Sequence, residues 1–151
     1  MSVLEDFEEF LRLLTEQHVA FLVVGGYAVA FHGYVRATHD IDLFYRNSEE
    51  NVRRILPALR SFGLPADEGV VAALRDPGSI VRVGVPPVRI ELINEISGVD
   101  FAEAWERRVE GRYGQVEVGY ISYGDLLSNR KAAGRPKDLA DIDELGGNRE
   151  A

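Results

Sequence analysis

The segment Val23-Val24-Gly25-Gly26-Tyr27-Ala28, followed by Arg36-Ala37-Thr38-His39-Asp40-Ile41-Asp42-Leu43, decides the fold that this sequence predicts. The apolar residues 20–24 predict a buried strand that runs into a glycine pair, where the backbone can approach a ligand closely. A helix that begins at this pair points its first amides outward and favours an anion.

Two acids mark the strand that comes next. Because side chains alternate along a strand, Asp40 and Asp42 share one face while Ile41 and Leu43 face the core. Two ionised carboxylates roughly 5 to 7 Å apart repel each other, so their pairing indicates a cation between them. Mg²⁺ prefers oxygen ligands and commonly combines one or two carboxylates with substrate phosphates. The glycine turn and the acid pair together predict a metal and phosphate site.

Length and composition favour a single domain over residues 1–145, followed by a disordered tail over residues 146–151. The chain has 151 residues and a hydrophobic content of 46%, which is ample for one core. It has no cysteine, which excludes disulfides, thiolate metal sites and a cysteine nucleophile. No secretory signal and no apolar run of about 18 residues is visible, so a cytoplasmic location is expected.

The charge distribution limits the possible partners. A net charge of -8 disfavours a long nucleic-acid groove, because such binding depends on Lys and Arg. A local anion site is compatible with the basic cluster Arg130, Lys131, Arg135 and Lys137, which contains both lysines of the chain. Three histidines without zinc-site spacing make a transition-metal site improbable.

Periodicity and capping signals predict an alternation of helices and strands. We expect residues 64–78 to form a loop or a short helical turn, and Pro57 to kink its helix. A Pro86-Pro87 turn is expected to join two strands into a hairpin. The predicted helices are 3–17, 26–31, 49–61, 101–108, 122–132 and one from Pro136 to Leu145, and the predicted strands are 20–24, 40–45, 79–85, 88–93 and 115–121.

These motifs resemble the nucleotidyltransferase superfamily, which has the polymerase beta-like fold, and within it the AbiEii toxin-like and uncharacterised bacterial members. The resemblance covers most of the chain. It rests on Gly25-Gly26, on Arg36-x-Thr38-x-Asp40-Ile41-Asp42, on Ile90-Glu91-Leu92-Ile93 and on the segment 126–141. The implied fold is α+β (two-layer α/β), with a mixed sheet of about four to five strands and helices packed against it. Glu91 stands where close relatives more often have Asp, and Gly26 where many members have Ser.

The resemblance implies a metal-dependent nucleotidyltransferase that moves a nucleoside monophosphate from a nucleoside triphosphate such as ATP to a hydroxyl acceptor on an RNA end such as tRNA, a protein or a small molecule. Two Mg²⁺ ions, for which Mn²⁺ can substitute, would be held by Asp40, Asp42 and Glu91, which are also the candidate catalytic residues. The candidate nucleotide and phosphate ligands are Gly25, Gly26, Arg36, Thr38 and Lys131; for Lys131 the resemblance alone supports the role.

Other interpretations of the same residues stay open at this stage. Glu91 shares a strand face with Arg89 and could form a surface ion pair, with Glu95 as a reserve third acid. Arg36 could order the loop or neutralise the aspartates when no metal is bound. Tyr27 and Tyr34 could stack on a base, although core packing is the more common role of such aromatics. The whole protein could be a catalytically weak binding module that acts as an antitoxin or as a regulatory partner of another protein, such as a toxin. It could also be a structural domain whose surface acids have no function.

Overall fold

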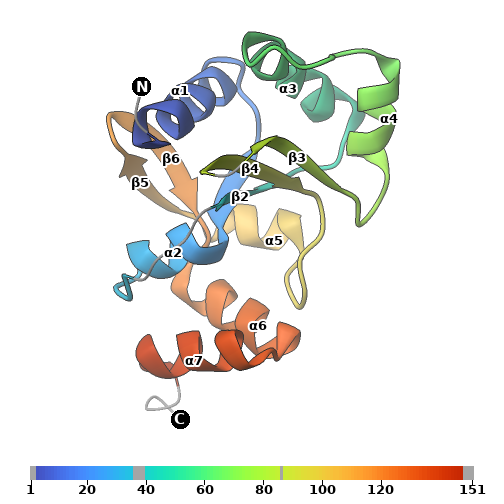
Figure 1. Cartoon of the computed structure of the whole chain (residues 1–151). Coiled ribbons are helices and arrows are strands. Elements are labelled where there is room, and N and C mark those ends of the chain that lie inside the picture. Colours follow the sequence, from blue (N-terminus) through green and yellow to red (C-terminus); the bar gives the residue numbers. More distant parts are fainter. Residues whose placement is uncertain (1–2, 36–39, 86, 148–151) are drawn as a thin grey trace.

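The computed structural model describes residues 3–35, 40–85 and 87–147. Within these ranges the chain forms helices and strands in an alternating order (Figure 1). Strand β2 carries the two predicted aspartates at its start. The elements are α1 (Val3–Glu16), β1 (Phe21–Val24), α2 (Gly25–Phe31), β2 (Asp40–Tyr45), α3 (Glu49–Ser61), α4 (Glu68–Arg75), β3 (Ile80–Val85), β4 (Val88–Ile93), α5 (Phe101–Glu106), β5 (Val109–Tyr113), β6 (Val116–Tyr120), α6 (Tyr123–Ala133) and α7 (Pro136–Glu144).

The strands form one mixed sheet in the order β3-β4-β2-β1-β6-β5. Strand β2 lies in its centre, antiparallel to β1 and parallel to β4. The outer strands β3 and β5 each pair antiparallel with a neighbour that is adjacent in sequence, β4 and β6. The parallel β2–β4 pairing needs a long crossover, which α3, α4 and β3 provide.

Helices cover both faces of the sheet, because the alternating side chains of the central strands are apolar on both sides. On one face, Ile41, Leu43 and Tyr45 of β2 belong to a large hydrophobic cluster with α1, α3 and α4. On the other face, Phe44 belongs to a smaller cluster with α2, α5 and α6. In Figure 1 the first group of helices lies above the sheet and the second lies below it. Asp40 and Asp42 point toward the second, smaller layer, since they alternate with Ile41 and Leu43.

The α+β class with a mixed sheet is confirmed, but the sheet has six strands rather than about four to five. The additional strand is β5, a short edge strand in which only Tyr113 is fully buried and which contains Gly111. Such a segment lacks the apolar alternation that reveals a strand. The segment expected to be a loop or a short turn contains the two-turn helix α4, whose N-cap Asp67 accepts a hydrogen bond from the Val70 amide at 3.1 Å.

Several of the predicted helix signals are confirmed by the cap geometry. The Ser48 hydroxyl caps α3 by accepting from the Asn51 amide, and Ser122 caps α6 by accepting from the Asp125 amide. Gly134 ends α6 with φ 66°, the left-handed conformation that favours glycine. Helix α3 continues through Pro57 as one helix. In the described part of the chain, no helix combines the length and the apolar character that crossing a membrane requires.

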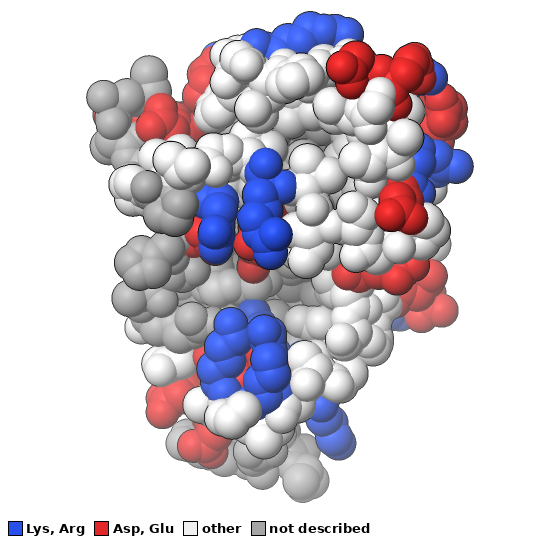
Figure 2. Space-filling model, turned by 45° about the vertical axis from the view of Figure 1, so that its right-hand side comes forward, with Lys and Arg blue, Asp and Glu red and all other residues white. Residues whose placement is uncertain are grey.

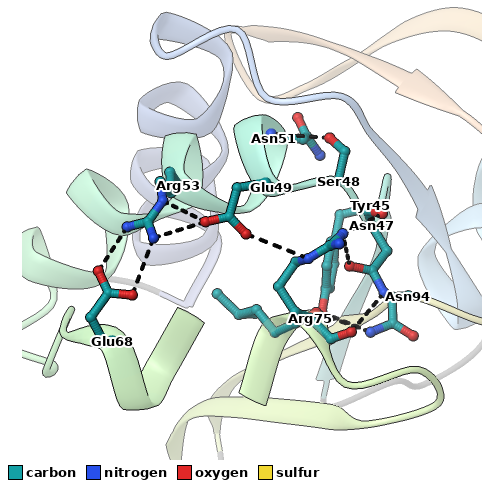
Figure 3. Close-up of polar contacts among 10 residues, drawn as sticks. Tyr45, Asn47, Ser48, Glu49, Asn51, Arg53, Glu68, Arg75 and Asn94 are labelled. Atoms are coloured by element: carbon teal, nitrogen blue, oxygen red, sulfur yellow. Dashed lines mark hydrogen bonds and ion pairs between the residues drawn. The ribbon is translucent and has the colours of Figure 1, made fainter. Parts of the chain in front are cut away.

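A polar network fixes the C-terminal end of β2 to its neighbours (Figure 3). The buried Tyr45 hydroxyl donates to the Leu74 carbonyl at 2.7 Å and accepts from the Asn94 amide at 3.2 Å. The same Asn94 amide nitrogen lies 3.1 Å from the Leu74 carbonyl and 3.0 Å from the Asp76 carbonyl. Asn94 follows directly after β4, so this network ties β4 to β2 and to α4.

Candidate active site

Three carboxylates meet on one wall of the site because of the strand register. In the parallel β2–β4 pair, Asp42 lies opposite Glu91 and Asp40 lies opposite Arg89. Side chains directly opposite each other in a sheet share a face and lie about 5 Å apart at Cβ. The predicted trio Asp40, Asp42 and Glu91 is therefore brought together by neighbouring strands, and all three residues line one cavity.

Asp42 is the most perturbed acid of this trio. Burial, reinforced by the negative charges of Glu91 and Asp40, raises the pKa of Asp42 to about 7, and Arg130 only partly opposes this rise. Its Oδ1 atom is buried and has no hydrogen-bond partner among the described residues. Buried polar atoms normally have a hydrogen-bond partner, so this oxygen is an exception.

Gly25 lets the backbone pass close to Asp42. Its φ of +67° is the left-handed conformation that only glycine adopts readily. A Cβ atom at this position would lie 2.2 Å from Asp42 Oδ2, which is far inside van der Waals contact. The first glycine of the predicted pair is therefore required both by the turn and by the carboxylate beside it.

Two arginines neutralise the other two acids. Arg89 binds Asp40 with two hydrogen bonds, from Nε to Oδ1 at 3.1 Å and from Nη2 to Oδ2 at 2.6 Å. Arg82 of β3 donates from Nε to Glu91 Oε1 at 3.2 Å, and Arg89 Nη2 lies 3.7 Å from the same oxygen. The expected Arg89–Glu91 pair is thus the weaker contact of Arg89, whose main partner is Asp40.

The opposite wall of the site is basic and is built by α6 and α7. Asp138 at the start of α7 is completely buried, and it accepts from Arg130 Nη1 at 2.8 Å and from Arg135 Nε at 2.6 Å. Burial alone would raise the pKa of Asp138, but the hydrogen bonds from Arg135 and Arg130 lower it. Asp138 therefore stays ionised and holds both guanidinium groups in position.

Arg130 keeps one donor unused. Its side chain is 6% exposed, and its Nε atom, 3.6 Å from Asp141 Oδ2, makes no hydrogen bond. Among the described residues, Asp42 Oδ1 and Arg130 Nε are the two buried side-chain atoms without a hydrogen-bond partner, and both residues line the same cavity. One buried acceptor and one buried donor thus remain unpaired across a single site.

The cavity between the two walls has a volume of about 770 Å³. Figure 2 shows two groups of Lys and Arg side chains on either side of a hollow, with acidic side chains next to them. A cavity of this size accommodates a nucleotide-sized ligand. Its lining includes Gly25, Gly26, Asp40, Asp42, Glu91, Glu95, Ser97, Asn129, Arg130, Arg135 and Lys137.

The other predicted phosphate ligands do not lie among the described residues that line the cavity. Lys131 is exposed in the last turn of α6 and does not belong to the described residues that line the cavity, whereas Lys137 does. The predicted phosphate ligands Arg36 and Thr38 lie outside the described residues. The same holds for Ser2, His39, Pro86 and residues 148–151.

Tyr27 and Tyr34, which could have stacked on a base, pack against hydrophobic clusters instead of lining the cavity. Tyr27 makes edge-to-face contacts with Phe7 and Tyr113, at centroid distances of 5.9 and 5.5 Å. Tyr34 packs against the smaller hydrophobic cluster. The reserve acid Glu95 does line the cavity, from the loop that follows β4.

Sequence reasoning missed two residues that organise the site. The first is Arg89, for which the sequence suggests only Glu91 as a partner. Asp40 and Asp42 are two residues apart, and so are Arg89 and Glu91. When Glu91 pairs with Asp42, Arg89 therefore lies opposite Asp40. Asp138 is the second of these residues. Its signal was its place three residues after Arg135, the N-cap of α7, because Asp138 Oδ2 accepts from the Arg135 backbone amide at 3.1 Å.

Carboxylate oxygens are the donors that a hard divalent cation prefers, but the described carboxylates are not arranged around one. Within residues 3–35, 40–85 and 87–147, no group of three or more Asp, Glu or His side chains is arranged to hold a metal ion. Two members of the trio are instead engaged by arginines. The carboxylate oxygen Asp42 Oδ1, which has no hydrogen bond, is of the type that such a cation prefers.

The mixed sheet and the paired carboxylates agree with the nucleotidyltransferase superfamily, which the family comparison shows. Residues 2–146 match the model of a family described as nucleotidyltransferase of unknown function (DUF6036), so the chain belongs to this family. No curated protein matches the chain with significant similarity.

Proposed function

We propose that the protein is a metal-dependent nucleotidyltransferase that transfers a nucleoside monophosphate from a nucleoside triphosphate to a hydroxyl acceptor. The observation that carries this proposal is the pair of unsatisfied buried atoms, Asp42 Oδ1 and Arg130 Nε, on opposite walls of one cavity. One is an acceptor suited to a cation and the other a donor suited to a phosphate oxygen. A metal-bound polyphosphate satisfies both.

Asp40, Asp42 and Glu91 are the residues that would hold Mg²⁺ ions. When bound, these ions neutralise phosphate charge and lower the pKa of the attacking hydroxyl. Glu91 lies opposite Asp42 and lines the cavity, so its carboxylate can also accept the proton of the acceptor hydroxyl. Gly25 has no side chain, so the backbone of this wall lies directly beside the Asp42 carboxylate.

The basic wall would bind the phosphates that leave as pyrophosphate. Arg130 is fixed by the buried Asp138, and its Nε atom, 3.6 Å from Asp141 Oδ2, makes no hydrogen bond that a phosphate would have to displace. Arg135 and Lys137 line the same wall. A guanidinium that is held in place before the ligand arrives stabilises developing negative charge without reorganising.

The experiment that tests this function is a transfer assay with α-³²P-labelled nucleoside triphosphates, Mg²⁺ and cell extract. The expected result is Mg²⁺-dependent labelling of a component of the extract, which identifies the acceptor as RNA, protein or small molecule. The Asp42→Asn protein is the matched control and should label nothing. Equal labelling by both proteins contradicts the proposal.

The arginine pairs favour a second candidate function, that of a binding module without catalysis, such as an antitoxin or a regulatory partner of another protein. Asp40 and Glu91 are already neutralised by Arg89 and Arg82, as they would be in a site that has no need of metal. Calorimetric titration with Mg²⁺-ATP distinguishes the two functions. Saturable binding favours the enzyme, and an absence of binding to the folded protein favours the binding module.

A further inference from the structure

We propose that Arg89 is a built-in counter-cation that exchanges Asp40 for a phosphate of the incoming ligand when a divalent metal ion enters the site. This inference rests on the proposed function and adds to it the way in which metal and substrate binding are coupled. Its basis is the geometry of two strands and not the presence of an ion.

The Arg89–Asp40 pair occupies the oxygens that a metal ion would use. Arg89 Nε and Nη2 each donate to a different oxygen of Asp40, so both carboxylate oxygens are engaged. A metal ion that binds Asp40 must therefore compete with a two-pronged guanidinium. It must also approach a positive charge that lies 3.7 Å from Glu91.

Register fixes this competition, so it is not an accident of one side-chain conformation. Arg89 lies directly opposite Asp40 in the parallel β2–β4 pair, and Arg82 lies directly opposite Glu91 in the antiparallel β3–β4 pair. The hairpin that supplies the third acid thus supplies the arginines that neutralise the site. The three acids would otherwise repel one another in the metal-free protein.

Arg89 can leave Asp40 without leaving the site. Its side chain is 32% exposed, compared with 6% for Arg130 on the other wall, so solvent and space are available to it. Arg89 is not one of the described residues that line the cavity, but its backbone in β4 lies opposite Asp40 and two residues before Glu91, which both line it. The released guanidinium therefore stays beside the cavity, where a phosphate is the natural new partner. A metal ion alone breaks the Arg89–Asp40 ion pair and leaves Arg89 without a new partner. A metal–triphosphate complex breaks the same pair but supplies a phosphate as the new partner of Arg89.

The exchange predicts that Arg89 weakens the binding of bare metal and strengthens the binding of metal with triphosphate. Such opposite effects of one residue make metal and phosphate binding positively coupled. A residue with a purely structural role would weaken both, and a residue that only contacts phosphate would leave the binding of bare metal unchanged.

The test compares the wild-type protein with Arg89→Gln. The affinity for Mn²⁺ alone is measured by electron paramagnetic resonance of the free ion, and the affinity for a preformed complex of Mn²⁺ with a non-hydrolysable nucleoside triphosphate is measured by calorimetry. Arg89→Gln should bind Mn²⁺ about five- to tenfold more tightly and the complex about three- to tenfold more weakly. Arg112→Gln is the matched control, because it removes an exposed arginine from β5 at the far edge of the same sheet and should change neither affinity.

A second variant and a second measurement cover the case in which Arg89→Gln folds poorly. Arg89→Lys keeps the charge but loses the two-pronged geometry, and should bind Mn²⁺ with an intermediate affinity. In thermal unfolding, Mn²⁺ should raise the Tm of Arg89→Gln more than that of the wild type. Unchanged Mn²⁺ affinity in both variants overturns the exchange and leaves the proposed function standing, whereas no Mn²⁺ binding by any of the proteins overturns both.

Discussion

The two ends of strand β2 differ in how well their polar groups are hydrogen-bonded. At the C-terminal end, Tyr45 and the nearby Asn94 make several hydrogen bonds (Figure 3). Asn51 accepts from the Ala20 amide at 2.7 Å and donates to two carbonyls. At the N-terminal end, three acids crowd together, and Asp42 Oδ1 has no hydrogen bond. Tyr45 lies five positions after Asp40, so one strand carries both arrangements.

The C-terminal end of β2 therefore stabilises the fold, whereas the N-terminal end destabilises the ligand-free protein. Satisfied buried polar groups stabilise a fold modestly and are costly to disrupt. An unsatisfied carboxylate among like charges destabilises the free protein and gains its partners only from a ligand. Changes at the N-terminal end of β2 should therefore reduce function and can increase stability, whereas changes at the C-terminal end should reduce stability alone.

The largest expected effect belongs to Asp42→Asn. We expect nucleotidyl transfer to fall by more than about 100-fold, because an amide is a poor ligand for a hard cation. In chelator, the free energy of unfolding should increase by about 2 to 4 kcal/mol at pH 8, since each pKa unit corresponds to about 1.4 kcal/mol. The measurements are the transfer assay and urea unfolding.

The pH dependence of this stabilisation has a definite sign. Because the folded-state pKa of Asp42 is raised from 3.8 to about 7, the wild type loses stability as the pH rises from 4 through 7. The gain in Asp42→Asn should accordingly shrink as the pH is lowered toward 4. Asp40→Asn is the matched control, and it should bring no such gain because Asp40 is the partner of Arg89. A gain that does not change with pH contradicts the assignment.

The second effect compares two glycines with similar backbone conformations. Gly25→Ala and Gly63→Ala both place a side chain at positive φ, +67° and +75°, which costs about 1 to 2 kcal/mol. Only at Gly25 does the new methyl group meet Asp42, whereas nothing lies within 4 Å at Gly63. We expect Gly25→Ala alone to weaken Mn²⁺ binding more than about tenfold, as measured by resonance titration. Equal Mn²⁺ affinities in the two variants would show that Gly25 serves only the turn.

The third effect concerns the well-paired end of β2. Asn51→Ala should lower the free energy of unfolding by about 2 to 3 kcal/mol, because it removes the acceptor of the buried Ala20 amide and one of the two donors to the Ala20 carbonyl. Mn²⁺ affinity should not change. Arg60→Ala, an exposed position on the same helix, should stay within about 0.5 kcal/mol of the wild type in chemical unfolding. A loss of metal binding in folded Asn51→Ala would mean that the two ends are not independent.

The smallest effect separates the two lysines. Lys137→Gln should weaken the binding of a nucleoside triphosphate about three- to tenfold, because Lys137 lines the cavity. Lys131→Gln should change it less than twofold, because Lys131 is exposed elsewhere on α6. Calorimetric titration measures both, and each protein has the same net charge. The reverse order would restore the phosphate role that the resemblance implies for Lys131.

Much of the acidic wall followed from the sequence alone because strand alternation is a strong rule. Asp40-x-Asp42 and Arg89-x-Glu91 each put two charges on one face, and apolar partners on the other face fix which face is buried. The pairing of these strands came from the resemblance, and the role of Arg89 depends on register. Register is a tertiary property that no local pattern contains.

The elements that sequence reasoning missed share a weak local signal. Strand β5 is a mostly exposed edge strand with a glycine in its middle, and α4 lies within a stretch of prolines and glycines. The role of Asp138 was hidden for another reason. Its burial depends on how α7 packs against α6, and a carboxylate on a short helix otherwise indicates solvent exposure.

The Asn94 network has a consequence for how the strands find each other. A slip of β4 by two residues would preserve its apolar alternation and would place Arg89 opposite Asp42, which local electrostatics would favour. What opposes the slip is Asn94, bound just beyond β4 to Tyr45 at the far end of β2. The hydrogen bonds of Asn94 at the C-terminal end of β2 thus fix the register that keeps Glu91 opposite Asp42, although the two carboxylates repel each other.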